Sequence, residues 1–250
     1  MPIRGDLDAV DTLQDLSVHN ALVYYFAPPP RSGETDPRMT NFLESISNDA
    51  LPVHLLYIST SGVYGDTGGD WVTEDSPLNP KTDRSKRRVD AERQVREWAS
   101  DSGVPYTILR VPGIYGPGRL PIDKVKSGRP VLREEDAPYS NRIHADDLAR
   151  ICVDAVTDGE PNEIYNISDG NPGSITEYYF AVADLLGVDR PPTISLEEAR
   201  EQFSPMLLSF LEESKRLDIS KIRDRLGYEP RFPSLVKGLQ ASLRVEGIIH

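Results

Sequence analysis

The apolar run Leu55-Leu56-Tyr57-Ile58 constrains the fold of this chain more than any other feature, because three hydroxyl residues follow it directly, at 59–61. A strand inside a parallel sheet is covered on both faces and is therefore an unbroken apolar run. In open α/β sheets, ligands bind just beyond the carboxyl ends of such strands. The pattern predicts a buried strand over 53–58 that delivers hydroxyl groups to a crevice at the edge of a sheet.

Further strand candidates alternate with helical patterns along the chain. The expected strands cover 21–26, 53–58, 106–111 and 163–167, and the expected helices cover 36–49, 83–100, 146–156, 175–186, 216–226 and 235–245. Such alternation is typical of βαβ units around a mainly parallel sheet. The proline-containing stretch 113–141 is expected to form loops at the carboxyl edge of that sheet.

Composition excludes several classes of function. The 250 residues carry a formal net charge of −12, which argues against a nucleic-acid partner. No apolar run approaches the roughly 18 residues of a membrane span, so no membrane partner is expected. The single cysteine, Cys152, excludes an internal disulfide and fits a cytoplasmic protein. We interpret Cys152 as a small buried apolar residue.

Five short motifs follow one another in a characteristic order. They are Ser-Thr-Ser-Gly-Val-Tyr-Gly at 59–65, Arg-Val-Pro-Gly-Ile-Tyr-Gly-Pro-Gly at 110–118, Arg-Ile-His-Ala-Asp-Asp-Leu-Ala at 142–149, Ile-Tyr-Asn-Ile-Ser-Asp-Gly at 164–170 and Leu-Gly-Tyr-Glu-Pro at 226–230. Together they resemble the extended and atypical short-chain dehydrogenases/reductases, the NAD-dependent epimerase/dehydratase group. The resemblance covers nearly the whole chain.

The resemblance implies an α/β fold with a Rossmann-like, doubly wound parallel sheet and a smaller carboxyl-terminal substrate-binding α/β region. The expected Rossmann-like domain covers 1–118, with 140–170 returning to its sheet. The substrate side would then comprise 119–139 and 171–250.

The resemblance also assigns roles to individual residues. Thr60 takes the catalytic Ser/Thr position, although the capping of a strand end explains the same residue. The residues expected along an NAD or NADP cofactor are Phe26, Ala27, Pro28, Ser59, Val111, Pro112, Gly113 and Ile114. A small-molecule substrate is expected to meet Ser61, Tyr64 and Arg142, while the neighbouring Asp146-Asp147 pair also fits a simple helix start.

The first departure from the family pattern concerns the proton donor. The family carries a Tyr and, four residues later on the same helix face, a Lys. Counted from Glu92, those positions hold Arg84 and Arg88, whereas a shifted register puts Thr82 and Lys86 there. In either register no tyrosine is present, since none lies between Gly65 and Tyr106. Arginine stays protonated and cannot act as a general acid at neutral pH. The two arginines are either an anion clamp with catalytic importance or ordinary surface residues, with Arg88 paired to Glu92. Tyr64, Tyr115 and Tyr139 are the substitute proton donors to test.

The second departure concerns the amino-terminal part. No Gly-x-Gly-x-x-Gly turn, which binds a pyrophosphate at a helix start, follows a strand near the beginning of the sequence. The sheet is therefore expected to be incomplete, with 22–26 as an apolar open edge. We favour a fragment or a misassigned start. The alternatives are a short form whose edge pairs with another subunit, as in a homodimer, and an edge rebuilt by the first residues.

Three hypotheses of function follow. The first is an NAD(P)-dependent oxidoreductase or epimerase-like enzyme that acts on a small polar or nucleotide-linked substrate with a non-standard proton donor. The second is a catalytically silent binding or regulatory protein on the same fold. The third, a serine or threonine hydrolase, lacks the Gly-x-Ser-x-Gly turn and is disfavoured.

Overall fold

The computed structural model describes residues 3–14 and 16–250. Its central sheet has the order β1-β2-β4-β9, and every pairing in it is parallel. The strands are β1 (Leu22–Tyr25), β2 (His54–Thr60), β4 (Tyr106–Val111) and β9 (Glu163–Asn166). The predicted strands and the Rossmann-like parallel sheet are thus confirmed.

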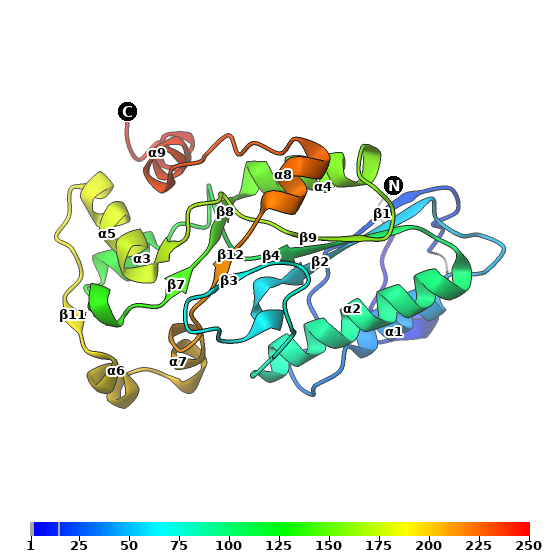
Figure 1. Cartoon of the computed structure of the whole chain (residues 1–250), viewed down its shortest axis with the longest axis horizontal. Helices are drawn as coiled ribbons and strands as arrows, with labels where there is room; N and C mark the ends of the chain where they lie inside the picture. Colours follow the sequence, from blue (N-terminus) through cyan, green and yellow to red (C-terminus); the bar gives the residue numbers. More distant parts are fainter. Residues whose placement is uncertain (1–2, 15) are drawn as a thin grey trace.

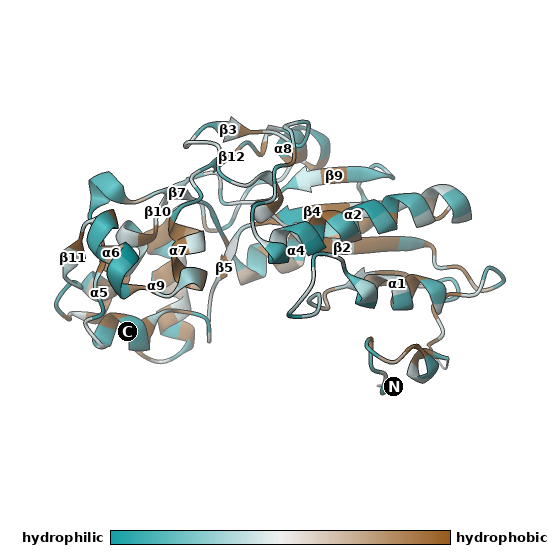
Figure 2. Cartoon of the chain, turned by 90° about the horizontal axis from the view of Figure 1, so that it is seen from below, coloured by the Kyte–Doolittle hydropathy of each residue, from teal (hydrophilic) through white to brown (hydrophobic). Residues whose placement is uncertain are grey.

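Helices cover both faces of this sheet (Figure 1). One face carries α1 (Pro37–Glu44) and α2 (Asp83–Ser102), which bury Met39, Phe42 and Val95 against the strands. The other face carries α4 (Ala145–Thr157) and α8 (Ser220–Leu226), which bury Ile151 and Ile222. Cys152 lies in this second core, as predicted. Figure 2 shows the apolar β2 and β4 beside the hydrophilic surfaces of α2 and α4.

Side chains at the helix ends explain where α1 and α2 begin and end. The Asp36 carboxylate caps α1, and the Thr82 hydroxyl caps α2. Helix α1 ends at Glu44, short of the predicted residue 49, and the Ser45 hydroxyl donates to the Phe42 carbonyl at this end. Helix α2 ends at Gly103, whose φ of 73° is the left-handed conformation that glycine tolerates.

A second group of elements, here called the α5 lobe, packs around two smaller apolar clusters. It comprises α3 (Ile122–Lys126), β6 (Val131–Leu132), α5 (Ile175–Leu186), β11 (Thr193–Ile194), α6 (Leu196–Gln202), α7 (Pro205–Leu211) and α9 (Leu235–Val245). The predicted helices over 175–186 and 235–245 are confirmed. In Figure 1 the lobe lies beyond the carboxyl ends of the central strands.

Short elements connect the sheet to the α5 lobe. They are η1 (Val10–Leu13), η2 (Ser61–Tyr64), β3 (Trp71–Val72), β5 (Gly113–Tyr115), η3 (Glu134–Asp136), β7 (Tyr139–Ser140), β8 (Arg142–His144), β10 (Gly173–Ser174) and β12 (Arg216–Leu217). Two predictions are corrected here. The stretch 113–141 contains short strands and a helix in addition to loops. The predicted helix 216–226 begins as β12, because Arg216 and Leu217 pair with Trp71 and Val72.

The sheet ends at β1. In the described part of the chain, β1 pairs only with β2, and Leu22 and the following Phe26 are exposed. The strand contains neither proline nor a charged residue, two devices that commonly protect such an edge. None of the described helices is long and apolar enough to cross a membrane.

Candidate active site at the carboxyl ends of the strands

Thr60 closes strand β2 at the edge of the sheet. Its register partner on β4 is Val111, so Thr60 and Val111 leave the sheet side by side. The Thr60 hydroxyl accepts a hydrogen bond from the backbone N–H of Gly62 at 3.2 Å, and this bond starts the turn η2. Among the described residues, the Thr60 hydroxyl accepts a hydrogen bond but donates none. Its proton can therefore be donated to a ligand oxygen. The structure thus shows the capping role of Thr60, and its catalytic role stays a prediction.

Gly62 lets η2 lie directly against the first turn of α2. A Cβ atom at Gly62 would sit 2.9 Å from the Ser85 hydroxyl oxygen and 3.5 Å from the Thr60 methyl carbon. Any side chain larger than hydrogen would push the turn away from the helix. This close approach brings Thr60 next to the start of α2, where the family carries its tyrosine.

Arg84 and Arg88 occupy that part of α2, but they do not form a pair that points to one place. The Arg84 guanidinium donates to the Ser209 hydroxyl at 3.1 Å and lies over the Phe210 ring. Arg88 donates to the Ile58 carbonyl and the Tyr57 hydroxyl, both at 3.0 Å. Arg88 is therefore not paired with Glu92, which corrects one of the interpretations above.

Arg142 approaches the same edge from a different strand. It lies on β8 opposite Gly113 of β5, the strand that continues from β4. Its side chain is buried, and it donates to the Ser140 hydroxyl at 2.9 Å and the Ser174 carbonyl at 2.6 Å. Burial lowers the pKa of Arg142, although the tyrosine and carboxyl groups around it act in the opposite direction.

A buried polar network lies beneath these residues. The Glu92 carboxylate accepts hydrogen bonds from the Ser59 hydroxyl at 2.5 Å and from the Arg110 guanidinium at 2.8 Å. Arg110 also donates to the Tyr64 hydroxyl at 2.8 Å, and that hydroxyl donates to the Asn166 side chain at 2.7 Å. The network joins β2, α2, β4, η2 and β9, and so holds the strand ends together.

This network changes the interpretation of two predicted contacts. The Ser59 hydroxyl is committed to Glu92, so its side chain does not face a cofactor. The Tyr64 hydroxyl is buried between Arg110 and Asn166, so both of its hydrogen bonds in the described structure are made within the protein. Burial raises the pKa of Tyr64 to about 12, against the opposing effect of Arg110. Tyr64 is thus a structural residue in this structure.

The other predicted contacts vary in exposure. Phe26, Pro28 and Gly113 are exposed, whereas Val111 is buried in the core. The remaining ones are partly buried: Ala27, Ser61, Pro112 and Ile114.

The two other tyrosines suggested as proton donors differ in burial. Tyr115 is buried with no hydrogen-bond partner for its hydroxyl, and burial raises its pKa. Tyr139 is half exposed and stacks on the Arg216 guanidinium.

The family's dinucleotide cofactor has two ends, and the described residues fit one of them better than the other. Thr60, Arg88 and the 111–114 segment offer the hydroxyl, cationic and apolar groups that suit a nicotinamide riboside. The helix that follows β1 offers no place for the pyrophosphate. Its start is occupied by the Asp36 carboxylate, which accepts bonds from the Arg38 and Met39 backbone at 3.1 and 3.3 Å.

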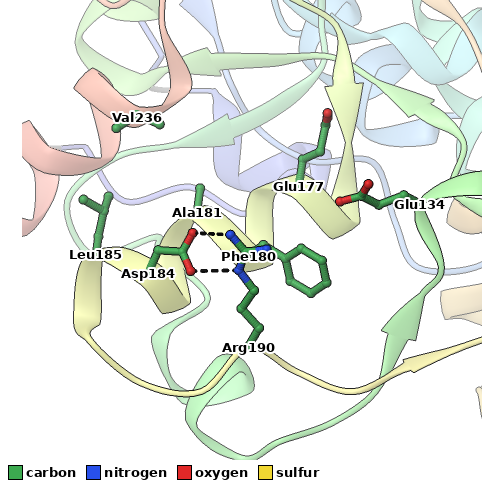
Figure 3. A pocket seen from close by; sticks show the side chains of 8 residues that line it. All are labelled: Glu134, Glu177, Phe180, Ala181, Asp184, Leu185, Arg190 and Val236. Carbon is green, nitrogen blue, oxygen red and sulfur yellow. Dashed lines mark hydrogen bonds and ion pairs between the residues drawn. The ribbon is translucent and has the colours of Figure 1, made fainter.

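An open pocket lies elsewhere, on the surface of the α5 lobe. It has a volume of about 320 Å³ and is lined by Glu134, Glu177, Phe180, Ala181, Asp184, Leu185, Arg190 and Val236. Its one cation is already paired, because Arg190 binds both oxygens of Asp184 (Figure 3). None of the predicted site residues lines this pocket.

Sequence reasoning did not identify Glu92, Arg110 and Asn166 as parts of the site. Arg110 carries the one charge in the otherwise apolar strand 106–111. A buried charge needs a partner. The charged Arg110 in a strand expected to be buried was therefore the sequence feature that could have predicted a polar network beneath the strand ends.

Comparisons with known proteins agree with this architecture. A sequence model of the NAD dependent epimerase/dehydratase family matches residues 38–168. The protein YeeZ of Escherichia coli is 28% identical over 91% of this chain and 76% of its own length. A dTDP-glucose 4,6-dehydratase of Neisseria meningitidis is 26% identical over 75% of this chain. The chain spans 56% of that dehydratase.

Solved structures show the same likeness. A conserved protein of unknown function from Silicibacter pomeroyi has a TM-score of 0.79 and 31% identity, covering 90% of this chain and 77% of its own. MoeE5, solved with UDP-glucose and NAD, has a TM-score of 0.76 at 23% identity, covers 98% of this chain and 85% of its own, and supports the fold alone. The fold thus defines an α/β protein of the Rossmann type. This chain belongs to the NAD-dependent epimerase/dehydratase family.

Proposed function

We propose that this protein binds a nicotinamide cofactor and a small anionic, nucleotide-linked substrate at the carboxyl ends of β2 and β4, and acts as an epimerase-like oxidoreductase. The observation that carries the proposal is a set of guanidiniums at that edge, on Arg84, Arg88 and Arg142. In the described part of the chain, each of them donates hydrogen bonds only to neutral groups. Carboxylates act on them through charge alone: Glu213 on Arg84, Asp36 on Arg88, and Asp169 and Glu177 on Arg142.

Guanidiniums with neutral partners stand out in a chain of net charge −12. By contrast, Arg110 in the network below is fully paired with the Glu92 carboxylate. A cation that donates hydrogen bonds only to neutral groups can still form a charge-assisted bond to a phosphate or carboxylate. One relative is named for dTDP-glucose, and one similar structure was solved with UDP-glucose. Both of these sugars carry phosphate groups, which supports the same class of ligand for this chain.

The chain's own residues would then divide the work. Thr60 donates its hydroxyl proton to the substrate oxygen, and Arg88 lies where the cofactor's ribose would pass. When bound, the nicotinamide supplies hydride exchange. Arg142 binds the anionic part of the substrate. NAD and NADP remain equal candidates, and the proton donor is a group other than a Tyr-Lys pair.

Calorimetric titration tests the anionic site. We expect Arg142→Gln to weaken binding of UDP-glucose about tenfold or more, because a hydrogen bond to a charged group contributes about 1.5–3 kcal/mol. Arg190→Gln is the matched control, since it removes the same charge from the surface of the α5 lobe. Equal losses in both variants, or no binding by the unmodified protein, would reject the proposal.

The alternative is a binding protein without catalysis, and one observation favours it. Arg84 and Arg88 stand where the family's proton donor and its lysine stand, and neither releases a proton at neutral pH. Incubation with UDP-glucose and NAD in D₂O separates the two functions. Chromatographic separation of sugar epimers combined with mass spectrometry detects both an isomerised sugar of unchanged mass and a dehydrated or deuterated one. Either product supports the enzyme, whereas binding with an unchanged sugar supports the silent form.

A further inference from the structure

Helix α7 reaches across from the α5 lobe and covers the Arg84 side chain. The Arg84 guanidinium carbon lies 3.6 Å from the centroid of the Phe210 ring. This is the shortest such distance in the described structure, where the next ones are 4.8 Å. The neighbouring Ser209 accepts the hydrogen bond from Arg84. Two adjacent residues of one helix thus fix one guanidinium.

The Phe210 ring is not part of an apolar core. It is 56% exposed, and its neighbours Met206 and Leu207 are exposed as well. The opposite side of α7 supplies the core contacts, through Leu208 and Leu211. A phenylalanine that keeps more than half of its surface in water gains little from burial. Its close contact with Arg84 is therefore the distinctive interaction of the ring.

The segment after α7 is fastened beside the crevice. The Ser214 carbonyl accepts hydrogen bonds from the backbone of Thr67 and Gly69, both at 3.0 Å. The Ser214 N–H donates to the Asp66 carboxylate at 2.8 Å. Residues 66–69 directly follow η2, the turn that Thr60 starts. These bonds hold the carboxyl end of α7 close to the turn that carries Thr60.

We propose that Ser209 and Phe210 are positioning residues that hold the Arg84 guanidinium at the crevice for a phosphate or carboxylate group of the ligand. The proposal rests on the proposed function and adds a determinant of specificity to it. The α5 lobe, through α7, sets how strongly the α2 side of the crevice binds an anion. Arg84 is presented by α7, whereas Arg88 is held by strand β2.

A double-mutant cycle tests this, with UDP-glucose and inorganic pyrophosphate as calorimetric probes. We expect Phe210→Leu to weaken binding about three- to tenfold, because it removes the cation–π contact and keeps an apolar side chain. Phe210→Trp retains a ring face and should restore affinity. Met206→Ala is the matched control, since this more exposed residue of α7 does not contact Arg84.

The decisive experiment introduces Phe210→Leu into a protein that already carries Arg84→Gln. If Phe210 acts through Arg84, Phe210→Leu has no further effect there. An equal loss in both backgrounds, or no loss in the unmodified background, overturns the proposal.

If Arg84→Gln itself leaves binding unchanged while Arg142→Gln weakens it, the positioning role fails and the proposed function stands. If the unmodified protein binds neither probe, both fail. Thermal unfolding of each variant identifies losses that come from misfolding.

Discussion

At the scale of single residues, the strand ends are held together by a buried ion pair, and neither of its charges would be stable in the core without the other. Glu92 is fully buried, and the Arg110 side chain is 4% exposed. Removing one member of such a pair leaves the other charge without a partner in a poorly solvated place. The lone arginine in strand 106–111 already pointed to a buried partner, but the sequence did not identify Glu92. That choice depends on how α2 lies across the sheet.

Glu92→Gln should therefore destabilise the protein by about 3–5 kcal/mol, as measured by urea unfolding. Glu97→Gln breaks the exposed pair with Arg93 on the same helix and should cost less than about 1 kcal/mol. Similar values for the two variants would show that the network carries little stability.

Asp169 should make stability depend on pH. Burial raises the pKa of Asp169 to about 6 in the folded protein, above its ordinary value of 3.8. Between these values the folded state binds more protons than the unfolded state, so stability falls as pH rises from about 4 to about 6.

Asp169→Asn should remove this penalty and gain about 2 kcal/mol relative to the unmodified protein across that interval. Urea unfolding of both proteins at several pH values measures the difference. A difference that stays constant with pH would contradict the expectation.

At the scale of elements, the sequence predicted the helices and strands whose apolar residues repeat with a regular local period. The long helices and the central strands were found, because each carries its own apolar pattern and its own start and stop residues. The two-residue strands, such as β12, were not found. They form only because residues far apart in the sequence meet, and a dipeptide has no readable period.

Helix α9 shows such a non-local constraint. A Cβ atom at Gly238 would lie 2.1 Å from the Tyr115 hydroxyl oxygen, so this glycine lets α9 pack on β5. Gly238→Ala should destabilise the protein by about 1–3 kcal/mol through overpacking, measured by thermal unfolding.

Tyr115→Phe removes a buried hydroxyl that has no hydrogen-bond partner, and it should be neutral or stabilising by itself. It should also reduce the cost of Gly238→Ala, because the nearest clashing atom is gone. An unchanged cost in the double variant would show that the ring, at 2.8 Å, determines the clash.

At the scale of the whole molecule, the edge of the sheet at β1 lacks the usual protection in the described part of the chain. Leu22 is 45% exposed on a strand without charge. Such edges favour pairing between molecules, whereas a lysine on the edge opposes it. We expect Leu22→Lys to lower self-association at high concentration, as measured by light scattering after size exclusion.

Val153→Lys is the matched control, because it adds the same charge at an equally exposed apolar residue of α4. The same decrease in both variants would assign the effect to net charge instead of the edge.

The pairing of β3 with β12 has a consequence for the order of folding. Trp71 and Val72 pair with Arg216 and Leu217. This pairing cannot form until most of the chain has been synthesised. Contacts between residues far apart in sequence form slowly, since closing the intervening loop costs entropy. During synthesis, β1, β2 and β4 can assemble early, whereas the pairing of β3 with β12 forms only later. A ribosome-bound intermediate would then contain a formed sheet core without the β3–β12 pair.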